Sequence, residues 1–254
     1  MADYDILGNI AIIKGENKTE EEKLNQAKKL LKQPSIKTVL EKSTNIKGRL
    51  RTIKTKFLAG EKTLIAIHKE NTCVFKFNVE TCYFSPRLSN DRKIVSEKIR
   101  KKDRVLVMFA GVGVYPIVIN KLKNPREIVA VEIGKECCKY FWENLKLNHV
   151  NDKIKMIQGD VKKKVGSKLG KFDVIVMARP NLKESFLKYA LLVSRKGTMI
   201  FYHLFCRDEE LNKELDKLKK EAGKLGKKIK IIRSIPVGDI APYKHRYRVE
   251  MRVL

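Results

Sequence analysis

The sequence predicts an α/β fold in which helices cover both faces of a parallel sheet, preceded by a small α+β domain. From residue 90 onward, short apolar runs alternate with helix-length amphipathic segments, which is typical of a parallel sheet. Before residue 80, strand signals cluster around one helix signal without this alternation. We therefore expect one domain over residues 1–82 and a second over residues 83–254.

The first domain opens with "YDILGNIAIIK" (4–14), which predicts two short strands around a glycine turn. A helix should follow, with Thr19 as its N-cap and its end before Pro34. The segment 35–43 fits either a strand or a short helix. Residues 49–84 contain three strand-like runs, with turns at "AGEK" and "HKEN".

The second domain should contain five strands that alternate with five helices. The strands are expected at 104–109, 128–133, 154–158, 172–178 and 198–205. The helices are expected near 89–101, 115–123, 135–148, 181–195 and 208–225. Two later strands, near 229–235 and 246–253, fit an antiparallel closure of the sheet.

The charge of the chain is strongly positive and unevenly spread. The 254 residues carry 56 Lys and Arg against 29 Asp and Glu, a formal net charge of +27. Residues 1–80 hold 16 of the basic and 10 of the acidic residues, so most of the excess lies in the second domain. Such a field attracts polyanions, of which nucleic acid is the usual one. A solvated, lysine-rich surface is the alternative.

Other features of the composition exclude several classes of protein. A hydrophobic content of 43% is typical of a folded globular chain. No apolar run approaches the roughly 20 residues of a membrane span, and the N-terminus lacks the basic start of a signal peptide. We expect a soluble, cytoplasmic monomer. The five cysteines include no C-x-x-C pair, so we expect reduced thiols, no disulfide framework and no metal site.

A glycine loop follows the first strand of the second domain. Phe109 leads into Gly111 and Gly113, which allow a tight turn and a close approach of the backbone to a ligand. Glu132 ends the next strand, where a carboxylate can accept both hydroxyls of a ribose. Asp160 ends the third strand, where an acidic group can meet an adenine edge. Ligands of an open parallel sheet bind at this carboxyl edge.

The loop departs from the dinucleotide-binding pattern. Pro116 occupies the third glycine position of G-x-G-x-x-G, which argues against a bound pyrophosphate and therefore against a nicotinamide dehydrogenase. A nucleoside without phosphates fits the site better, and S-adenosylmethionine is the common cofactor of this kind.

Five segments carry a family resemblance: "CYFSPRLSNDRKIVSEKI", "VLVMFAGVGVYPIVI", "VAVEIGKECCKYFWENLKLN", "MIQGD" and "DVIVMARPNLKESFL". Together they resemble the archaeal and eukaryotic tRNA (guanine-N1)-methyltransferases, which modify the guanosine 3′ of the anticodon. "YDILGNIAII", "RLRT" and "LAGEKTLIAIHKEN" are similar to that family's second domain, so the resemblance covers nearly the whole chain. It implies a Rossmann-like class I methyltransferase sheet, S-adenosylmethionine as the cofactor and the tRNA anticodon stem-loop as the partner.

The resemblance also implies how the methyl transfer proceeds. N1 of guanine carries a proton at neutral pH, so its lone pair attacks only after that proton is removed. The family places a glutamate after "FSPRL" as the base, and this position is Asp91 here. An arginine at the position of Arg51 stabilises the negative charge that develops on O6. From local pattern alone, Asp91 also fits the first turn of a helix, and Arg51 a phosphate contact.

The remaining site residues follow from the same resemblance and from the strand ends. The cofactor-binding set is Tyr83, Phe84, Arg92, Phe109, Gly111, Gly113, Glu132, Ile133, Asp160, Val161, Ala178 and Pro180. The set expected to contact RNA is Arg87, Arg179, Tyr243, Lys244 and Arg246. The last three lie in the tyrosine-rich "PYKHRYR", which fits stacking on RNA or an exposed edge strand. His203, after "IFY", is interpreted as a strand-end histidine rather than as a base.

One departure from the family keeps alternatives open. The chain has Ala178-Arg179-Pro180 where the family has Asn-Leu-Pro, so the amide that can bind the target base is absent. Methylation of carbon on the tricyclic wyosine precursor stays open as a second activity. Two rivals also stay open: an aminocarboxypropyl transferase of wybutosine synthesis, and a tRNA-binding protein with reduced catalysis. The intact "FSPRL" favours methyl transfer.

Overall fold

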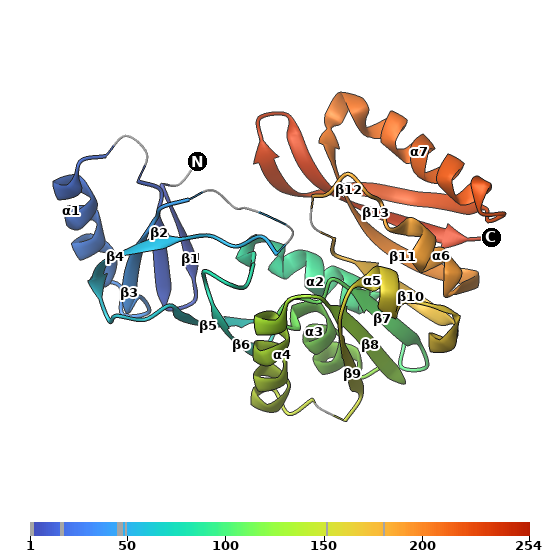
Figure 1. The fold of residues 1–254 in the computed structure, drawn as a ribbon, viewed down its shortest axis with the longest axis horizontal. Coiled ribbons are helices and arrows are strands. Elements are labelled where there is room, and N and C mark those ends of the chain that lie inside the picture. Colours follow the sequence, from blue (N-terminus) through green and yellow to red (C-terminus); the bar gives the residue numbers. More distant parts are fainter. Residues whose placement is uncertain (1–2, 16–17, 45–47, 49, 151, 180) are drawn as a thin grey trace.

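The structure is a computed structural model that describes residues 3–15, 18–44, 48, 50–150, 152–179 and 181–254. Figure 1 shows a small N-terminal part beside a larger part, with a two-stranded hairpin between them. The described residues form a four-stranded sheet in the order β1-β2-β3-β4, the hairpin β5-β6, and a seven-stranded sheet in the order β12-β13-β11-β10-β7-β8-β9. The expected α/β fold with a small N-terminal α+β part is confirmed.

The N-terminal sheet packs against a single helix. Its elements are β1 (Tyr4–Leu7), β2 (Ile10–Ile13), α1 (Glu20–Leu31), β3 (Thr38–Lys42) and β4 (Thr55–Gly60). Thr19 caps α1 as expected: its hydroxyl accepts from the Glu22 N–H at 3.2 Å, and the Glu22 carboxylate accepts from the Thr19 N–H at 2.7 Å. The segment left open as strand or helix is the strand β3.

The two faces of this sheet are buried against different partners. Ala11, Ile13 and Val39 pack under α1, whereas Ile10 and Ile12 join the core of the larger part. Because successive strand residues point to opposite faces, one short strand serves both contacts. The boundary expected between residues 82 and 83 stays a prediction, since the sheet, the hairpin and the larger part share this core.

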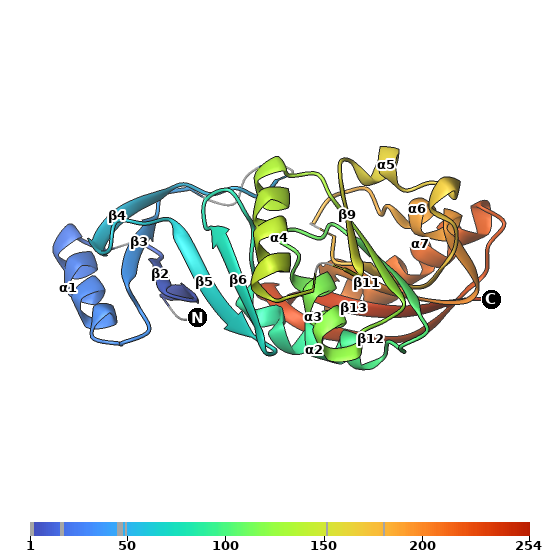
Figure 2. The same ribbon diagram turned by 90° about the horizontal axis from the view of Figure 1, so that it is seen from below.

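The hairpin consists of β5 (Ile65–Glu70) and β6 (Cys73–Asn78). Asn71 and Thr72 both have positive φ, as the turn of a two-residue hairpin requires. Figure 2 shows the hairpin beside α4 (Lys135–Leu147). The expected strands are present, and the turn lies at the end of "HKEN".

Two asparagines of the larger part bind the free edge of β6. Asn148 accepts from the Val74 N–H at 2.8 Å and donates to the Val74 carbonyl at 2.7 Å. Asn144 accepts from the Lys76 N–H at 2.7 Å and donates to the Lys76 carbonyl at 3.1 Å. The two amides lie one helical turn apart and pair with alternate strand residues, so they satisfy an edge that would otherwise lack partners.

The seven-stranded sheet brings several strand ends to one edge. Its parallel strands are β7 (Arg104–Met108), β8 (Glu127–Glu132), β9 (Ile154–Gln158), β10 (Phe172–Met177) and β11 (Ser194–Arg207). β12 (Ile229–Ala241) and β13 (Lys244–Val253) close it as an antiparallel hairpin. Met108 pairs with Val131 on one side and Met177 on the other, so the loops after these three strands meet.

Helices cover both faces of this sheet. One face carries α2 (Ser89–Glu97), α3 (Val114–Lys123) and α4, and the other carries α5 (Val161–Lys164), α6 (Leu187–Leu192) and α7 (Leu211–Lys224). Short 3-10 turns lie at Pro86–Leu88, Ser167–Leu169 and Asp208–Glu210. Val105 and Val107 of β7 pack on the first face, and Leu106 and Met108 on the second. Within the described residues, no helix is long and apolar enough to cross a membrane.

Several element boundaries differ from the sequence prediction. The helix expected over 181–195 is shorter, because Ser194 already pairs with Phe172 as the first residue of β11. The late strands are longer than expected and form one extended hairpin. Pro236 lies in β12, which is an edge strand, where a missing N–H is tolerated.

We predict that Asn144→Leu lowers the free energy of unfolding by about 3 kcal/mol, because it keeps the volume but leaves buried backbone groups of Lys76 and Val112 without partners. Urea denaturation measures this change. Asn212→Leu, on the exposed side of α7, is the matched control and should change stability by less than about 0.5 kcal/mol. Equal effects of the two variants would contradict this role of Asn144.

Candidate active site

A cavity opens at the edge where the loops after β7, β8 and β10 meet. It lies between these loops, the segment before α2, and β13. Twelve of the residues expected in the site line it: Arg51, Tyr83, Phe84, Arg92, Phe109, Gly111, Glu132, Ile133, Val161, Ala178, Arg179 and Arg246. The remaining expected residues are treated below, except Pro180, which lies outside the described residues.

The glycine loop needs both of its glycines, for different reasons. Gly111 has a φ of 57° and faces open space, so its backbone lies free at the cavity. Gly113 has a φ of 88°, and a Cβ there would lie 2.1 Å from Cδ2 of Phe141. Gly113 therefore supports the loop by close packing against α4, while Gly111 gives a ligand access to the backbone.

Glu132 holds the loops on both sides of the cavity. Its carboxylate accepts from the Gly111 N–H at 2.8 Å and from the Gly134 N–H at 2.7 Å. Burial raises the pKa of Glu132, and backbone hydrogen bonds from Gly134, Gly111 and Ile133 offset the effect only in part. A carboxylate has about four acceptor sites, so acceptor capacity remains for a hydroxyl group of a ligand.

Asp160 has a structural role in this structure. Its side chain accepts from the Lys162 N–H at 2.9 Å as the N-cap of α5, and it is not among the cavity-lining residues. Its neighbours Gly159 and Val161 do line the cavity. The contact of Asp160 with an adenine edge stays a prediction.

Two arginines and a tyrosine form a cationic wall of the cavity. The Arg51 guanidinium lies 3.9 Å from the centre of the Tyr83 ring, and Arg246 donates to the Tyr83 hydroxyl at 3.2 Å. Burial would raise the pKa of Tyr83, but the charges of Arg246 and Arg51 leave it below the usual value. The Nε groups of Arg51 and Arg246 are buried without a partner among the described residues. They are therefore donors available to a ligand.

A second cavity adjoins the first across this wall. It shares Arg51, Tyr83 and Arg246 with the first cavity and extends between the N-terminal sheet and β12. Arg87 lines it and forms an ion pair with Asp5 at 2.5 Å. Basic side chains thus line a path from the surface of the N-terminal part, through the second cavity, to the first cavity.

Tyr243 and Lys244 lie farther out than the other expected RNA contacts. Tyr243 is 77% exposed at the turn between β12 and β13, and Lys244 begins β13. Neither lines a cavity described above. An exposed aromatic ring beside basic residues is suited to stacking on a base, and this contact stays a prediction.

Arg92 and Arg179, which were also expected to contact a ligand, are bound to protein groups as well. Arg92 forms a two-point ion pair with Glu70 and donates to the Ser85 carbonyl at 3.0 Å. Arg179 is buried and donates to the carbonyls of Leu182 and Glu184. Arg179 thereby fixes the loop after β10, and its contact with RNA stays a prediction.

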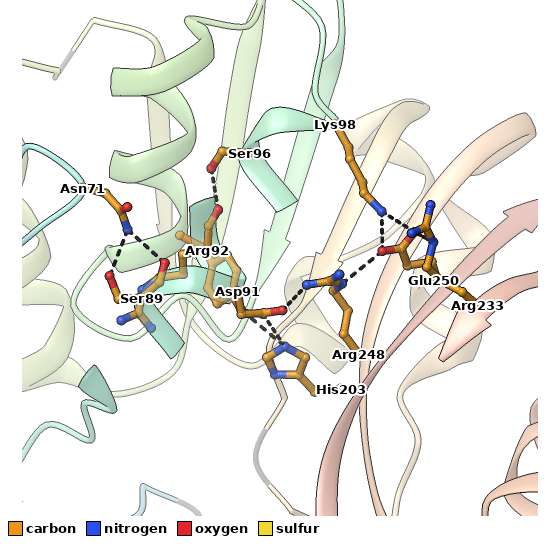
Figure 3. Close-up of polar contacts among 11 residues, drawn as sticks. Asn71, Ser89, Asp91, Arg92, Ser96, Lys98, His203, Arg233, Arg248 and Glu250 are labelled. Atoms are coloured by element: carbon orange, nitrogen blue, oxygen red, sulfur yellow. Dashed lines mark hydrogen bonds and ion pairs between the residues drawn. The ribbon is translucent and has the colours of Figure 1, made fainter. Parts of the chain in front are cut away.

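Asp91 lies in a buried polar cluster (Figure 3). Its carboxylate accepts from the Tyr115 hydroxyl and from Arg248, and it lies 3.2 Å from Nε2 of His203. Burial alone would raise the pKa of Asp91, but these donors and the charge of Arg248 hold it well below its usual range. Tyr115 and His203 line the first cavity and Asp91 does not. The role of Asp91 as the base stays a prediction.

The polar cluster around Asp91 continues along β13 toward the edge strand β12. Arg248 donates to Glu250 at 3.1 Å, and Glu250 accepts from Lys98 at 2.6 Å. Arg233 of β12 lies 3.2 Å from the same carboxylate. Each buried charge of this cluster therefore has an opposite charge beside it, as burial requires.

His203 and Tyr115 are two polar residues among the lining residues that the sequence did not identify as part of the site. The expected strand-end position of His203 is wrong, because it lies within β11 and is paired with Arg248 of β13. The apolar neighbours "IFY" predict only a buried strand. The polar side chains around His203 come from α2, α3 and β13, which are distant in the sequence.

The five cysteines lie in the interior of the protein. All five cysteines are free and buried, as expected for reduced thiols. Cys82 and Cys137 bring their sulfur atoms within 2.9 Å of each other. Within the described ranges, no group of three His, Cys, Asp or Glu side chains is arranged to hold a metal ion.

Comparison with known families and proteins gives consistent matches. The family described as TRM5/TYW2 methyltransferase domain matches residues 66–232, and the TYW2 N-terminal domain matches residues 1–63. Trm5b of Pyrococcus abyssi, a tRNA (guanine(37)-N(1))-methyltransferase, is 30% identical over 98% of this chain and 74% of its own length. Taw22 of Nanoarchaeum equitans, a tRNA (guanine(37)-N(1))/4-demethylwyosine(37)-methyltransferase, is 40% identical over 58% of this chain and 49% of its own length.

A third relative has a different named activity. The tRNA(Phe) (4-demethylwyosine(37)-C(7)) aminocarboxypropyltransferase of Methanocaldococcus jannaschii is 28% identical over 89% of this chain and 88% of its own length. Among solved structures, a complex of aTrm5 with tRNALeu matches with a TM-score of 0.85, 25% identity, and coverage of 98% and 71%. M. jannaschii Trm5 in complex with adenosine matches with a TM-score of 0.81, 25% identity, and coverage of 98% and 73%.

We predict that Gly113→Ala lowers the free energy of unfolding by about 4 kcal/mol, because the new methyl group overlaps Phe141 and the φ is unfavourable. The new methyl group of Gly111→Ala, in the same loop, meets open space. This variant should lower the free energy of unfolding by about 1 kcal/mol, from its positive φ alone. Urea denaturation midpoints of the two variants test the difference. Equal losses of unfolding free energy in the two variants would show that packing on Phe141 does not hold the loop.

Proposed function

We propose a function from one premise: the chain belongs to the TRM5/TYW2 methyltransferase family. The protein transfers the methyl group of S-adenosylmethionine to N1 of the guanosine 3′ of the anticodon in a tRNA. One observation carries this proposal: a single cavity joins a glycine loop and a ribose-type acceptor, Glu132, to the unpartnered donors of Arg51 and Arg246. The glycine loop and Glu132 suit a nucleoside cofactor, and the two arginines suit an electron-rich base.

The cofactor half of the cavity fits an adenosine moiety. Glu132 has acceptor capacity left for a ribose hydroxyl, and the open face of Gly111 admits close contact with backbone. A related solved structure holds adenosine. When S-adenosylmethionine is bound, its sulfonium supplies the methyl group, and the protein needs mainly to align it with the base.

The base half of the cavity fits a guanine whose N1 has lost its proton. Negative charge then develops on O6, and Arg51 carries an unpartnered N–H together with a positive charge. The second cavity gives a route for a base that is turned out of an RNA loop. The related structure with tRNALeu supports an RNA partner, and so does the net charge of +27.

Methylation of the tricyclic wyosine precursor is the second candidate. The name of the Nanoarchaeum relative joins both substrates, and its identity to this chain is 40%. Ala178 leaves more room beside the base than an asparagine would, which suits a larger ring. Aminocarboxypropyl transfer is less favoured, because the relative with that name is 28% identical and "FSPRL" is intact here.

Nucleoside mass spectrometry tests the proposal. Unmodified tRNA and tRNA that carries the tricyclic precursor are each incubated with the protein and methyl-labelled S-adenosylmethionine. Labelled N1-methylguanosine next to the anticodon is the expected product. Label on the tricyclic base alone would replace the first candidate by the second, and no label on either tRNA would contradict both.

We predict that Glu132→Gln weakens binding of S-adenosylhomocysteine by about 10-fold to 100-fold, because hydroxyl donors lose a charged acceptor. Since the pKa of Glu132 is raised above its usual 4.5, affinity in the native protein should fall as the pH is lowered through that raised pKa. Calorimetric titration at several pH values measures both effects. Glu136→Gln, on the exposed side of α4, is the control, and a similar loss there would contradict the assignment.

We predict that Arg51→Ala lowers the single-turnover methylation rate by about 100-fold while S-adenosylhomocysteine binding changes by less than about 2-fold. The reason is that Arg51 acts on O6 of the base and not on the cofactor. Rapid-quench kinetics and calorimetry measure the two quantities. Equal losses in both would show that Arg51 supports the cavity as a whole.

A further inference from the structure

We propose that Arg246 of β13 recognises the target base, with its guanidinium donating to N7 of the guanine while Arg51 faces O6. The inference rests on the proposed function and deepens it, because it names the edge of the base that the cationic wall contacts. Guanine carries O6 and N7 as neighbouring acceptors on one edge. The wall carries two neighbouring guanidinium groups, both in contact with Tyr83.

Arg246 differs from the other buried arginine on the same face of β13. Arg248 is 1% exposed and binds the carboxylates of Asp91 and Glu250. Arg246 is 9% exposed, and no carboxylate of the described residues forms an ion pair with it. A buried cation without an anion beside it is costly. The protein therefore keeps at Arg246 a positive charge whose partner has to come from a ligand.

Arg51 and Arg246 are close enough to repel each other. The Arg51 guanidinium lies 3.9 Å from the centre of the Tyr83 ring, and Arg246 donates to the Tyr83 hydroxyl at 3.2 Å. Burial lowers the pKa of Arg51, Tyr83 opposes this effect, and the charge of Arg246 lowers the pKa further. A ligand edge with two adjacent electron-rich atoms relieves this repulsion, because each cation then faces an acceptor.

Other donors that line the first cavity are engaged within the protein. Arg92 is bound to Glu70, and Tyr115 donates to Asp91. Arg179 donates to backbone carbonyls of its own loop. Arg51 and Arg246 are therefore the two cationic side chains of this cavity that are best placed to bind a base.

The position of Arg246 favours a base over a phosphate of the RNA backbone. Arg246 lines the first cavity together with the glycine loop, and its guanidinium lies 5.2 Å from the centre of the Phe205 ring. A phosphodiester keeps its charge and loses much hydration on burial, so it suits exposed cations. Arg87 is exposed and lines the second cavity but not the first. A phosphate is thus better placed beside Arg87, and the base beside Arg246.

A single-atom change in the substrate tests the contact with N7. A tRNA that carries 7-deazaguanosine at the target position keeps N1 and O6 but has a C–H group in place of N7. We compare single-turnover methylation of this tRNA and of the guanosine-bearing tRNA at subsaturating protein. The rate ratio of the two tRNAs should be about 10-fold larger for the native protein than for Arg246→Met, because only the native protein loses a charge-assisted hydrogen bond.

The comparison of ratios isolates the contact from other effects of the substituted base. Any change in the acidity of N1 is common to both proteins and cancels in the comparison. Arg252→Met is the matched control, because Arg252 is an exposed arginine of the same strand that lines neither cavity. It should keep the native ratio. Equal ratios in the native protein and Arg246→Met would overturn the proposal.

Neutral methylphosphonate linkages on either side of the target guanosine test the phosphate alternative. If Arg246 binds N7, these linkages should slow the native protein and Arg246→Met by the same factor. If Arg246 binds a phosphate, they should slow the native protein but not the variant. That second result would overturn the contact with N7.

Thermal unfolding of the free protein separates recognition from a structural role. Arg246→Met removes a cation that has no carboxylate partner, so its unfolding midpoint should stay the same or rise. Arg248→Met leaves Asp91 without its cation and should lower the midpoint. Equal losses in the two variants would show that Arg246 is structural and would overturn the proposal.

Two results with the native protein separate this inference from the proposed function. A native protein that forms no N1-methylguanosine on unmodified tRNA overturns the proposed function and the inference with it. A native protein that forms this product, and methylates the 7-deazaguanosine tRNA at the same rate, overturns the inference alone, whatever the variants do.

Discussion

A buried carboxylate lies where four elements of the larger part of the chain meet. Asp91 in α2 accepts from Tyr115 in α3 and from Arg248 in β13, and it faces His203 in β11. An ionised group in such a place is stable only while its donors keep their positions, since the loss of one partner leaves an uncompensated buried charge. The arrangement of these elements around the cavity therefore depends on this cluster, and Glu250 extends it to Lys98 and Arg233.

The same cluster determines where the cationic wall of the cavity lies. Residues two apart on a strand share a face, so Arg246, Arg248 and Glu250 lie on one face of β13. Arg246 lines the cavity, while Arg248 binds Asp91 and Glu250 binds Lys98. Arg248 is fixed by Asp91, and Arg246 is thereby held beside Tyr83 and Arg51. The long hairpin of β12 and β13 thus contributes directly to the site. Asn144 of α4 and Asn148, which caps its C-terminus, hold the hairpin of β5 and β6 from the other side.

Local sequence patterns predicted the features that depend on a few neighbouring residues. The cap of α1, the glycine loop and the acidic end of β8 follow from spacing and backbone preference alone. The surroundings of Asp91 do not, because its partners lie 112 and 157 residues away along the chain. Periodicity identifies β11 and β13 as strands but does not state which of their side chains meet. Arg179 is a different case: it binds the carbonyls of Leu182 and Glu184, three and five residues away, but the sequence pattern does not show that the loop turns these carbonyls toward its side chain.

Because burial lowers the pKa of His203 and its Nε2 faces the ionised Asp91, the charge and tautomer of this ring follow from the cluster and are open to direct measurement. Nitrogen-15 NMR of histidine-labelled protein, with His203→Gln used to assign the signal, distinguishes the two neutral tautomers and the imidazolium. The account predicts a neutral ring at pH 7 with the proton on Nε2, facing Asp91, and a bare Nδ1. A proton on Nδ1 alone, or a doubly protonated ring at this pH, would contradict it.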